Sequence, residues 1–446
     1  MKNRCETLAI ACLLMRVLLT IPMMWAQQPP MQQQTELTKN EKSQISGILY
    51  DAYNDVKKYY YDPKLHGVDW EACYQQYVAR IEKTRNLGEG FRLVAAFLSE
   101  LKDSHNFFIP PERTNHYYPG YKIELVGNDG FITQLRPNSD AASKLHIGDQ
   151  VVMHTGYKLN REDFYDLRYY YTTLAPRPSV ELVVRSPGSA VRTVVVDSKV
   201  KVEKKYYNYK ETIDHRYDEL RDYENENHAT RSRVVERGDV AIWKLQHFFV
   251  EDGEISRAIR IARNHKTLIL DLRGNPGGSA DTLKMIVGSL FDKDIKIADR
   301  VTRKDTKPML AKHQGTPFEG KIIVLVDASS ASAAELLARV IQLENRGTVI
   351  GDKTAGAVME ARLYVDTQQV DTMFAYGFSI TDADLIMSDG KSLEKTGVLP
   401  DEVLLPTGAD LAAGCDPVLA HAAELAGIKL DTIAAGKMFP YEWAPL

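Results

Sequence analysis

Three serines stand where an apolar strand segment gives way to a helix, in the stretch from Asp327 to Ser332. The apolar run ends at Val326, and leucine, valine and isoleucine recur at helical spacing after Ser332. A serine at such a junction lies at the positive end of the helix dipole, beside N–H groups that can bind a developing oxyanion. The stretch therefore predicts either a nucleophile or an ordinary N-cap, because serine is a preferred cap residue.

A glycine-rich loop, Gly274-Asn-Pro-Gly277-Gly278, follows a second apolar strand segment. Adjacent glycines let a backbone amide approach a ligand closely or adopt a positive φ. The spacing of a phosphate-binding loop that ends in Gly-Lys-Ser/Thr is absent. An ordinary strand-to-helix turn is one interpretation. An oxyanion hole that combines an N–H of Gly277 or Gly278 with that of Ala333 accounts for both loops.

A Ser-His pair, Ser104-His105, follows an amphipathic helical pattern that runs from Phe91 to Leu101. Side chains at such a helix-to-loop junction can point into a cleft. The ordinary pKa of histidine suits a general base near neutral pH. A lone histidine in this position is more often structural, so its role depends on its context.

The residues after Gly238 alternate between strand and helix patterns. Strands are expected at 240–245, 267–272, 321–326 and 348–351, and helices at 255–264, 281–291 and 332–343. This alternation predicts an α/β domain, at 239–446, with a largely parallel sheet. Because sites in such sheets lie beyond the carboxyl ends of the strands, the glycine loop and the serine turn are expected at one edge.

The chain before this domain divides into four segments: 1–26 as a signal peptide, 27–117 as a helical segment that carries Ser104 and His105, 118–199 as a β domain, and 200–238 as a charged connector. A capping box of Thr38 and Glu41 marks the first helix. Within the β domain, FITQLRPNSDAASKLHIGDQVVMHTGYKLN resembles the core of a PDZ domain, which binds peptides by strand addition. A small β spacer is the alternative.

Three motifs in order, TLILDLRGNPGGSADT, SASAAELLARVIQLENRGTVIGDKTAG and KTGVLPDEV, follow the PDZ-like segment. Together they resemble the C-terminal processing peptidases and the core of tricorn protease. The resemblance implies a crotonase-like α/β core with an inserted PDZ domain and serine peptidase activity. Its Ser-Ala-(Ser/Ala)-Glu signature falls on Ser332, which leaves Ser329 and Ser330 as turn residues.

The sequence departs from the branch of this family that uses a Ser/Lys dyad. Ala357 occupies the lysine position, and Lys353 lies nearby in a different register. The tricorn branch uses a Ser-His-Ser-Glu tetrad whose Ser-His pair precedes the PDZ segment. By that resemblance His105 is the general base, Ser104 orients it, and Glu394, just before the Gly-Val-x-Pro-Asp segment, backs Ser104.

The composition excludes some other classes of function. The chain has 446 residues, with 56 Lys and Arg against 60 Asp and Glu and a net charge of −4. This balance argues against a nucleic-acid partner, which usually requires a concentrated basic excess. The sequence contains no HExxH motif and no CxxC pair in the mature chain, so no metal and no other cofactor is expected.

The first residues predict export. Lys2 and Arg4 precede an apolar run that ends near Ala26, which is typical of a signal peptide that is removed by cleavage. An uncleaved anchor is the alternative, although Arg16 interrupts the run. The mature protein would be periplasmic or extracellular with no stable membrane span. It would keep only Cys73 and Cys415, whose spacing does not decide whether they pair.

The combined prediction is an exported serine peptidase that acts on peptides, unfolded proteins or protein C-terminal regions through an acyl-enzyme on Ser332. A non-catalytic binding protein on the same scaffold remains an alternative, as the retinoid-binding relatives of the family show. A peptide-binding module in which only the PDZ-like segment matters is the third possibility.

Overall fold

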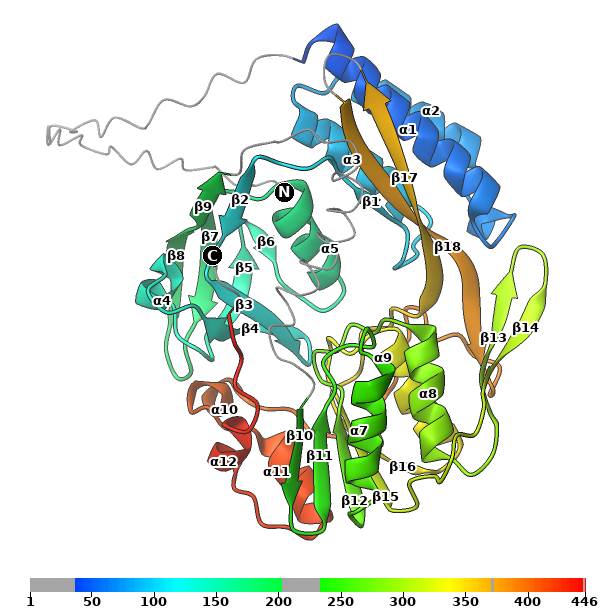
Figure 1. Ribbon diagram of the computed structural model, residues 1–446. Helices are drawn as coiled ribbons and strands as arrows, with labels where there is room; N and C mark the ends of the chain where they lie inside the picture. The colour runs from blue at the N-terminus through cyan, green and yellow to red at the C-terminus, as the bar shows by residue number, and fades with distance from the viewer. Residues whose placement is uncertain (1–36, 203–232, 370–372, 444–445) are drawn as a thin grey trace, which may run out of the picture.

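The computed structural model describes residues 37–202, 233–369, 373–443 and 446. Figure 1 shows a helical N-terminal region, a small β domain, and an α/β region with further helices at its C-terminal end. The predicted signal peptide and residues 203–232 of the predicted connector lie outside the described residues. In the part of the chain that is described, no helix is both long and apolar enough to cross a bilayer.

The N-terminal region consists of α1 (Lys39–Tyr59), the 3₁₀ turn η1 (Leu65–Gly67), α2 (Trp70–Ile81) and α3 (Leu87–Ser99). α1 begins at the predicted capping box, where Thr38 and Glu41 exchange hydrogen bonds. The apolar faces of the three helices share one core with Phe108, Phe378 and Ile380. The helices therefore pack directly on the strands that flank the Ser104-His105 segment.

The β domain predicted at 118–199 contains an antiparallel sheet of order β3-β4-β5-β7-β8, in which β6 also pairs with β5. A short helix, α4, follows its N-cap residue Ser139. The elements of this domain are β2 (Asn115–Tyr118), β3 (Tyr121–Val126), β4 (Asp129–Leu135), α4 (Asp140–Lys144), β5 (Gln150–His154), β6 (Tyr157–Lys158), α5 (Phe164–Tyr169), η2 (Tyr170–Leu174), β7 (Ser179–Arg185), β8 (Val191–Asp197) and β9 (Lys199–Val202). β2 pairs with β9 outside the main sheet.

The α/β region has a six-stranded sheet of order β10-β11-β12-β15-β16-β19, in which only β10 is antiparallel. Its strands are β10 (Arg233–Arg237), β11 (Val240–Lys244), β12 (Thr267–Asp271), β15 (Lys321–Val326), β16 (Gly347–Gly351) and β19 (Glu402–Val403). The helices α7 (Asp252–Ala262), α8 (Ala280–Leu290) and α9 (Ala333–Leu343) cover one face. All the strands and helices predicted after residue 238 are present, and β10 adds a strand inside the predicted connector.

A second sheet has no counterpart in the sequence analysis. It contains β1 (Phe107–Ile109), β13 (Ile295–Thr302), β14 (Thr306–Ala311), β17 (Met359–Gln369) and β18 (Met373–Met387). β1 pairs with the middle of β18, with Phe107 opposite Ser379. This pairing places the Ser104-His105 segment, which belongs to the N-terminal region, next to a strand from the C-terminal half of the chain.

The C-terminal helices α10 (Gly408–Ala412), α11 (Pro417–Leu425) and α12 (Thr432–Gly436) follow the last strand. Val418, Leu419 and Ala422 of α11 pack on the face of the six-stranded sheet opposite to α7, α8 and α9. The sheet is therefore covered on both faces, as expected for parallel strands that are apolar throughout. Cys73 and Cys415 are both free thiols.

Candidate active site

Ser332 lies in the turn between β15 and α9, at the N-cap position of the helix. Its backbone angles are φ 53° and ψ −117°, whereas an ordinary N-cap residue is extended with a negative φ. Such a strained conformation costs about 1–3 kcal/mol and is concentrated at functional sites. The neighbouring Ser330 is buried, and its hydroxyl donates to Leu272 O at 2.9 Å. Ser330 is therefore a turn residue, while capping alone does not account for Ser332.

The glycine loop lies directly against this serine. A methyl group added at Gly277 would be 2.6 Å from Ser332 Cβ, so only glycine fits there. Buried Asn275 fixes the loop, because its Nδ2 donates to Leu245 O at 2.9 Å and its Oδ1 accepts from Gly277 N at 2.8 Å. Its carbonyl oxygen accepts from Ala331 N at 2.9 Å. The two loops that the sequence singled out are thus hydrogen-bonded to one another.

Gly277 and Gly278, the two glycines next to Ser332, differ in whether their N–H group is already hydrogen-bonded. The Gly277 N–H already donates to Asn275. Among the described residues, the N–H groups of Gly278 and Ala333 have no hydrogen-bond acceptor. The geometry therefore favours Gly278 over Gly277 as the partner of Ala333 in an oxyanion hole.

Ser104, His105 and Glu394 form a continuous hydrogen-bonded chain. Ser104 Oγ donates to Glu394 Oε2 at 2.8 Å and lies 2.9 Å from His105 Nδ1. Since the hydroxyl has a single proton and gives it to the carboxylate, it must accept from Nδ1–H of the imidazole. This tautomer leaves His105 Nε2 with a free lone pair, as a general base requires.

The His105 segment is fixed by a second buried carboxylate, Asp103. This side chain accepts from His105 N at 2.8 Å, from Tyr60 OH at 3.0 Å and from Thr381 Oγ1 at 2.8 Å. Burial of the imidazole lowers the pKa of His105 below its ordinary value, while the charge of Asp103 acts in the opposite direction. A lowered pKa keeps the ring neutral, and able to accept a proton, at neutral pH.

The carboxylate of Glu394 accepts three hydrogen bonds. Its carboxylate accepts from the backbone N–H of Ser104 at 2.9 Å and of Val358 at 3.0 Å, in addition to the Ser104 hydroxyl. Burial raises the pKa of Glu394 above its ordinary value, and the hydrogen bonds from Ser104 partly offset this. The contact to Val358 places this carboxylate next to the segment that touches Ser332.

Sequence reasoning assigned no role to Glu335, although the structure gives it a central place. Its fully buried carboxylate accepts from Ser332 N at 3.1 Å, Gly356 N at 2.8 Å, Ala357 N at 3.0 Å and Thr354 Oγ1 at 2.5 Å. Burial raises the pKa of Glu335 to about 7, against these hydrogen bonds. The Ser-x-x-Glu spacing of a capping box, Ser332 to Glu335, is the signal that would have found it.

The segment that Glu335 holds occupies the lysine position of the Ser/Lys branch. Ala357 O accepts from Ser332 N at 2.9 Å, so residue 357 lies beside the serine as the resemblance implies. The Lys353 side chain is exposed, and its main-chain oxygen accepts from Arg161 at 2.8 Å. No hydrogen bond joins Ser332 Oγ to His105 within the described residues. The nucleophile turn and the Ser-His-Glu chain are therefore two separately organised halves.

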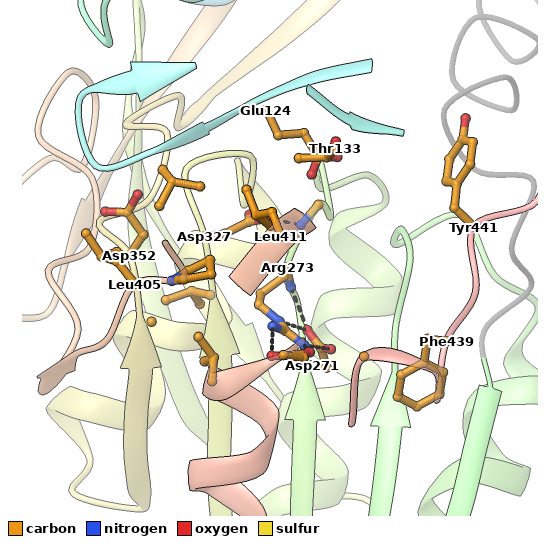
Figure 2. Close-up of a pocket in the computed structure, with 18 of the residues that line it drawn as sticks. Glu124, Thr133, Asp271, Arg273, Asp327, Asp352, Leu405, Leu411, Phe439 and Tyr441 are labelled. Atoms are coloured by element: carbon orange, nitrogen blue, oxygen red, sulfur yellow. Dashed lines mark hydrogen bonds and ion pairs between the residues drawn. The ribbon is translucent and has the colours of Figure 1, made fainter. Parts of the chain in front are cut away.

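A cavity of about 260 Å³ lies between the β domain and the carboxyl ends of the α/β strands. Figure 2 shows Glu124 and Thr133 above it and Asp271, Arg273 and Asp327 below it. Arg273 pairs with Asp271 and with Asp416 of the C-terminal region. Asp327 accepts from Gly274 N at 2.9 Å and thereby links the serine turn to the glycine loop. The described residues contain no cluster of three or more His, Cys, Asp or Glu side chains suited to a metal ion.

Comparison with known proteins relates the sequence of this chain to peptidase families. Residues 239–404 match peptidase family S41, and residues 44–98 match the tricorn protease C1 domain. Over 427 residues the chain is 24% identical to tricorn protease homolog 2 of Streptomyces coelicolor, covering 87% of this chain and 33% of that protein. It is 29% identical over 136 residues to a carboxyl-terminal-processing protease of Synechocystis sp., covering 30% of each chain.

Other relatives agree with this assignment. A CtpA-like serine protease of Staphylococcus aureus is 23% identical over 320 residues, which cover 69% of this chain and 58% of that protein. The matched region thus spans less than two thirds of each of these three relatives. The crystal structure of mature CPAF shares the fold, with a TM-score of 0.62 at 15% identity, and the match covers 84% of this chain and 94% of that one. Residues 239–404 thus form a peptidase family S41 domain, and the likeness to a carboxyl-terminal-processing protease supports the family that includes the C-terminal processing peptidases.

Proposed function

We propose that this chain is an exported serine peptidase that cleaves peptides or the C-terminal regions of proteins with Ser332 as nucleophile. The observation that carries the proposal is the chain from Glu394 through Ser104 to His105, because it leaves Nε2 of the imidazole free to accept a proton. The strained backbone of Ser332 and its contact with the glycine loop support the same role.

These contacts support the following catalytic cycle. As substrate binds, His105 Nε2 accepts the proton of Ser332 Oγ while the oxygen attacks the scissile carbonyl carbon. The N–H groups of Gly278 and Ala333 receive the oxyanion, with Gly277 packed against the serine. His105 then gives the proton to the departing amine, which leaves an ester on Ser332. Water, activated by the same imidazole, hydrolyses the ester and restores the hydroxyl.

Ser104 and Glu394 act as positioning residues in this scheme. The Glu394 carboxylate orients the Ser104 hydroxyl, which in turn fixes the tautomer of His105 and stabilises the imidazolium that forms. No cofactor takes part. The β domain would capture an extended end of the substrate as an added strand, which is supported by the position of β3 at the edge of its sheet.

A fluorophosphonate probe, which labels activated serines, tests the proposal together with peptide cleavage. Wild-type protein should be labelled on Ser332, and Ser332→Ala and His105→Ala should each lose labelling and cleavage. Ser329→Ala is a matched control because this serine lies in the same turn, and it should behave as wild type. A Ser332→Ala variant that still cleaves peptides would overturn the assignment. Folded wild-type protein that neither labels nor cleaves would instead favour the non-catalytic binding protein.

A further inference from the structure

Phe249 is an exposed aromatic residue in the segment that follows β11. Its side chain is 60% exposed, whereas that of its neighbour Phe248 is fully buried in the main core of the α/β region. A single exposed hydrophobic residue is common on protein surfaces and by itself indicates nothing. The position of this ring relative to Ser332 is what distinguishes it.

The segment around Phe249 is hydrogen-bonded to the glycine loop. Phe248 N donates to Gly277 O at 2.7 Å, and Ser279 N donates to Phe248 O at 3.3 Å. A methyl group added at Gly278 would lie 3.0 Å from two carbons of the Phe249 ring, so the ring packs over this glycine. Phe249 therefore flanks the glycine whose N–H is proposed to hold the oxyanion.

The backbone of Phe249 is also anchored within its own segment. Phe249 N donates to Nδ1 of His247 at 3.1 Å, and the centres of the two rings are 6.5 Å apart. Burial lowers the pKa of His247, so its ring is neutral and able to accept that N–H at neutral pH. An aromatic ring on an anchored backbone offers an apolar wall, and its segment has less entropy to lose when a ligand covers it.

We propose that Phe249 is a specificity-determining residue that selects an apolar side chain on the substrate residue supplying the scissile carbonyl. The inference rests on the proposed peptidase function. If Gly278 N–H holds the carbonyl oxygen of that residue, its side chain leaves the backbone next to the glycine that Phe249 covers. An apolar side chain would cover the exposed ring, whereas a polar one would lose hydration without gaining a hydrogen bond.

The test compares two peptides that differ only at that residue, with Leu in one and Ser in the other. Wild-type protein should prefer the Leu peptide in kcat/KM, and Phe249→Ala should reduce the preference by about 10-fold to 100-fold, the range of discrimination that an apolar pocket provides. Phe249→Leu should restore most of it. Tyr50→Ala, which removes a 54% exposed aromatic ring from α1, is the matched control and should leave the ratio unchanged.

A binding measurement separates this inference from the proposed function. In a Ser332→Ala background, the dissociation constants of the same two peptides are compared with and without Phe249→Ala by fluorescence anisotropy. If Phe249→Ala lowers the Leu-to-Ser ratio of affinities, the inference is supported even if the wild-type protein proves inactive. A Leu-to-Ser ratio that Phe249→Ala leaves unchanged, in cleavage or in binding, overturns it. Fluorophosphonate labelling that persists in Phe249→Ala shows that the serine itself is intact.

Discussion

The two halves of the site are built in different ways. The Ser332 half is local: Glu335 lies three residues from the serine and reaches Thr354, Gly356 and Ala357, at most 22 positions away. The His105 half is assembled over long separations, with 290 positions between Ser104 and Glu394. The nucleophile is thus fixed by its own turn and neighbouring loop, whereas the base is fixed only once the second sheet has formed.

The two halves also use their buried carboxylates differently. Glu335 accepts from three backbone N–H groups and one hydroxyl, and none of these four donors belongs to Ser104 or His105. Glu394 accepts from Ser104, which is itself bonded to His105. Loss of Glu394 should therefore damage proton transfer, while loss of Glu335 should loosen the position of the nucleophile. The variants below separate these two effects.

The largest effect is expected from Glu394→Gln. Both carboxylate oxygens face a backbone N–H, from Ser104 or Val358, so an amide in either orientation sets its NH₂ against a donor. We expect kcat to fall about 1,000-fold to 10,000-fold, the effect of losing the correct imidazole tautomer in a serine protease triad. Glu402→Gln, an exposed carboxylate bonded to His421, serves as the control. A fall below 10-fold would show that the base half functions without its carboxylate.

Gly277→Ala should be the most damaging change in the nucleophile half. The added methyl group would lie 2.6 Å from Ser332 Cβ and 2.9 Å from Ala331 O. We expect a loss in kcat of about 100-fold to 1,000-fold, similar to the loss of an oxyanion donor. Gly274→Ala is the matched control, because this glycine of the same loop also has a positive φ but has no atom within 4 Å of the added carbon. Equal activity of the two variants would contradict the close contact.

Glu335→Gln should change the pH dependence of the nucleophile half. The pKa of Glu335 is raised to about 7. Protonation turns one of its two accepting oxygens into a hydroxyl donor, so the carboxyl group can no longer accept all four hydrogen bonds. Wild-type kcat/KM should therefore rise with an apparent pKa near 7. The variant should be less active at every pH, because its amide faces the same backbone donors, but it should lose this limb and keep only the limb of His105, whose pKa lies below its ordinary value. A profile that stays the same in the variant would exclude this role.

The same shift predicts an effect on stability. The folded pKa of Glu335 lies above its ordinary value of 4.5, so the native state binds the extra proton between these values. Its contribution to the free energy of unfolding is therefore fully present below pH 4.5 and is lost as the pH rises through about 7. The free energy of unfolding, measured with urea, should decrease more from pH 5 to pH 8 in the wild type than in Glu335→Gln. An equal decrease in the two proteins would mean that a group other than Glu335 titrates in this pH range.

This contrast explains what could be predicted from the sequence. The nucleophile half lies on strands and helices with clear hydrophobic periodicity, so the serine turn and the glycine loop could be placed at strand ends from local patterns. The choice of Ser332 among the three serines of the turn came from the resemblance. Glu394 and Ser104 were assigned only by resemblance, since no local pattern reports a contact across 290 positions. The second sheet was missed for the same reason: β18 is 15 residues long and pairs with β1, β13 and β17, which are far apart along the chain. Glu335 ends the Ser-Ala-(Ser/Ala)-Glu signature, but the signature assigns it no role, and its contacts to Thr354, Gly356 and Ala357 leave no local pattern.

The smallest effect is expected where the β domain touches the nucleophile half. Arg161 pairs with Asp352 at 2.6 Å and donates to Lys353 O at 2.8 Å, immediately before the segment that Glu335 holds. Because Glu335 fixes that segment independently, Arg161→Ala should lower kcat/KM by less than about 10-fold, consistent with the modest value of a partly exposed ion pair. Arg192→Ala, whose partner Asp149 lies within the β domain, controls for a general loss of stability. A loss of 100-fold or more in Arg161→Ala alone would mean that the nucleophile turn depends on the β domain as strongly as the base depends on the second sheet, and the contrast between a local and a long-range half would fail.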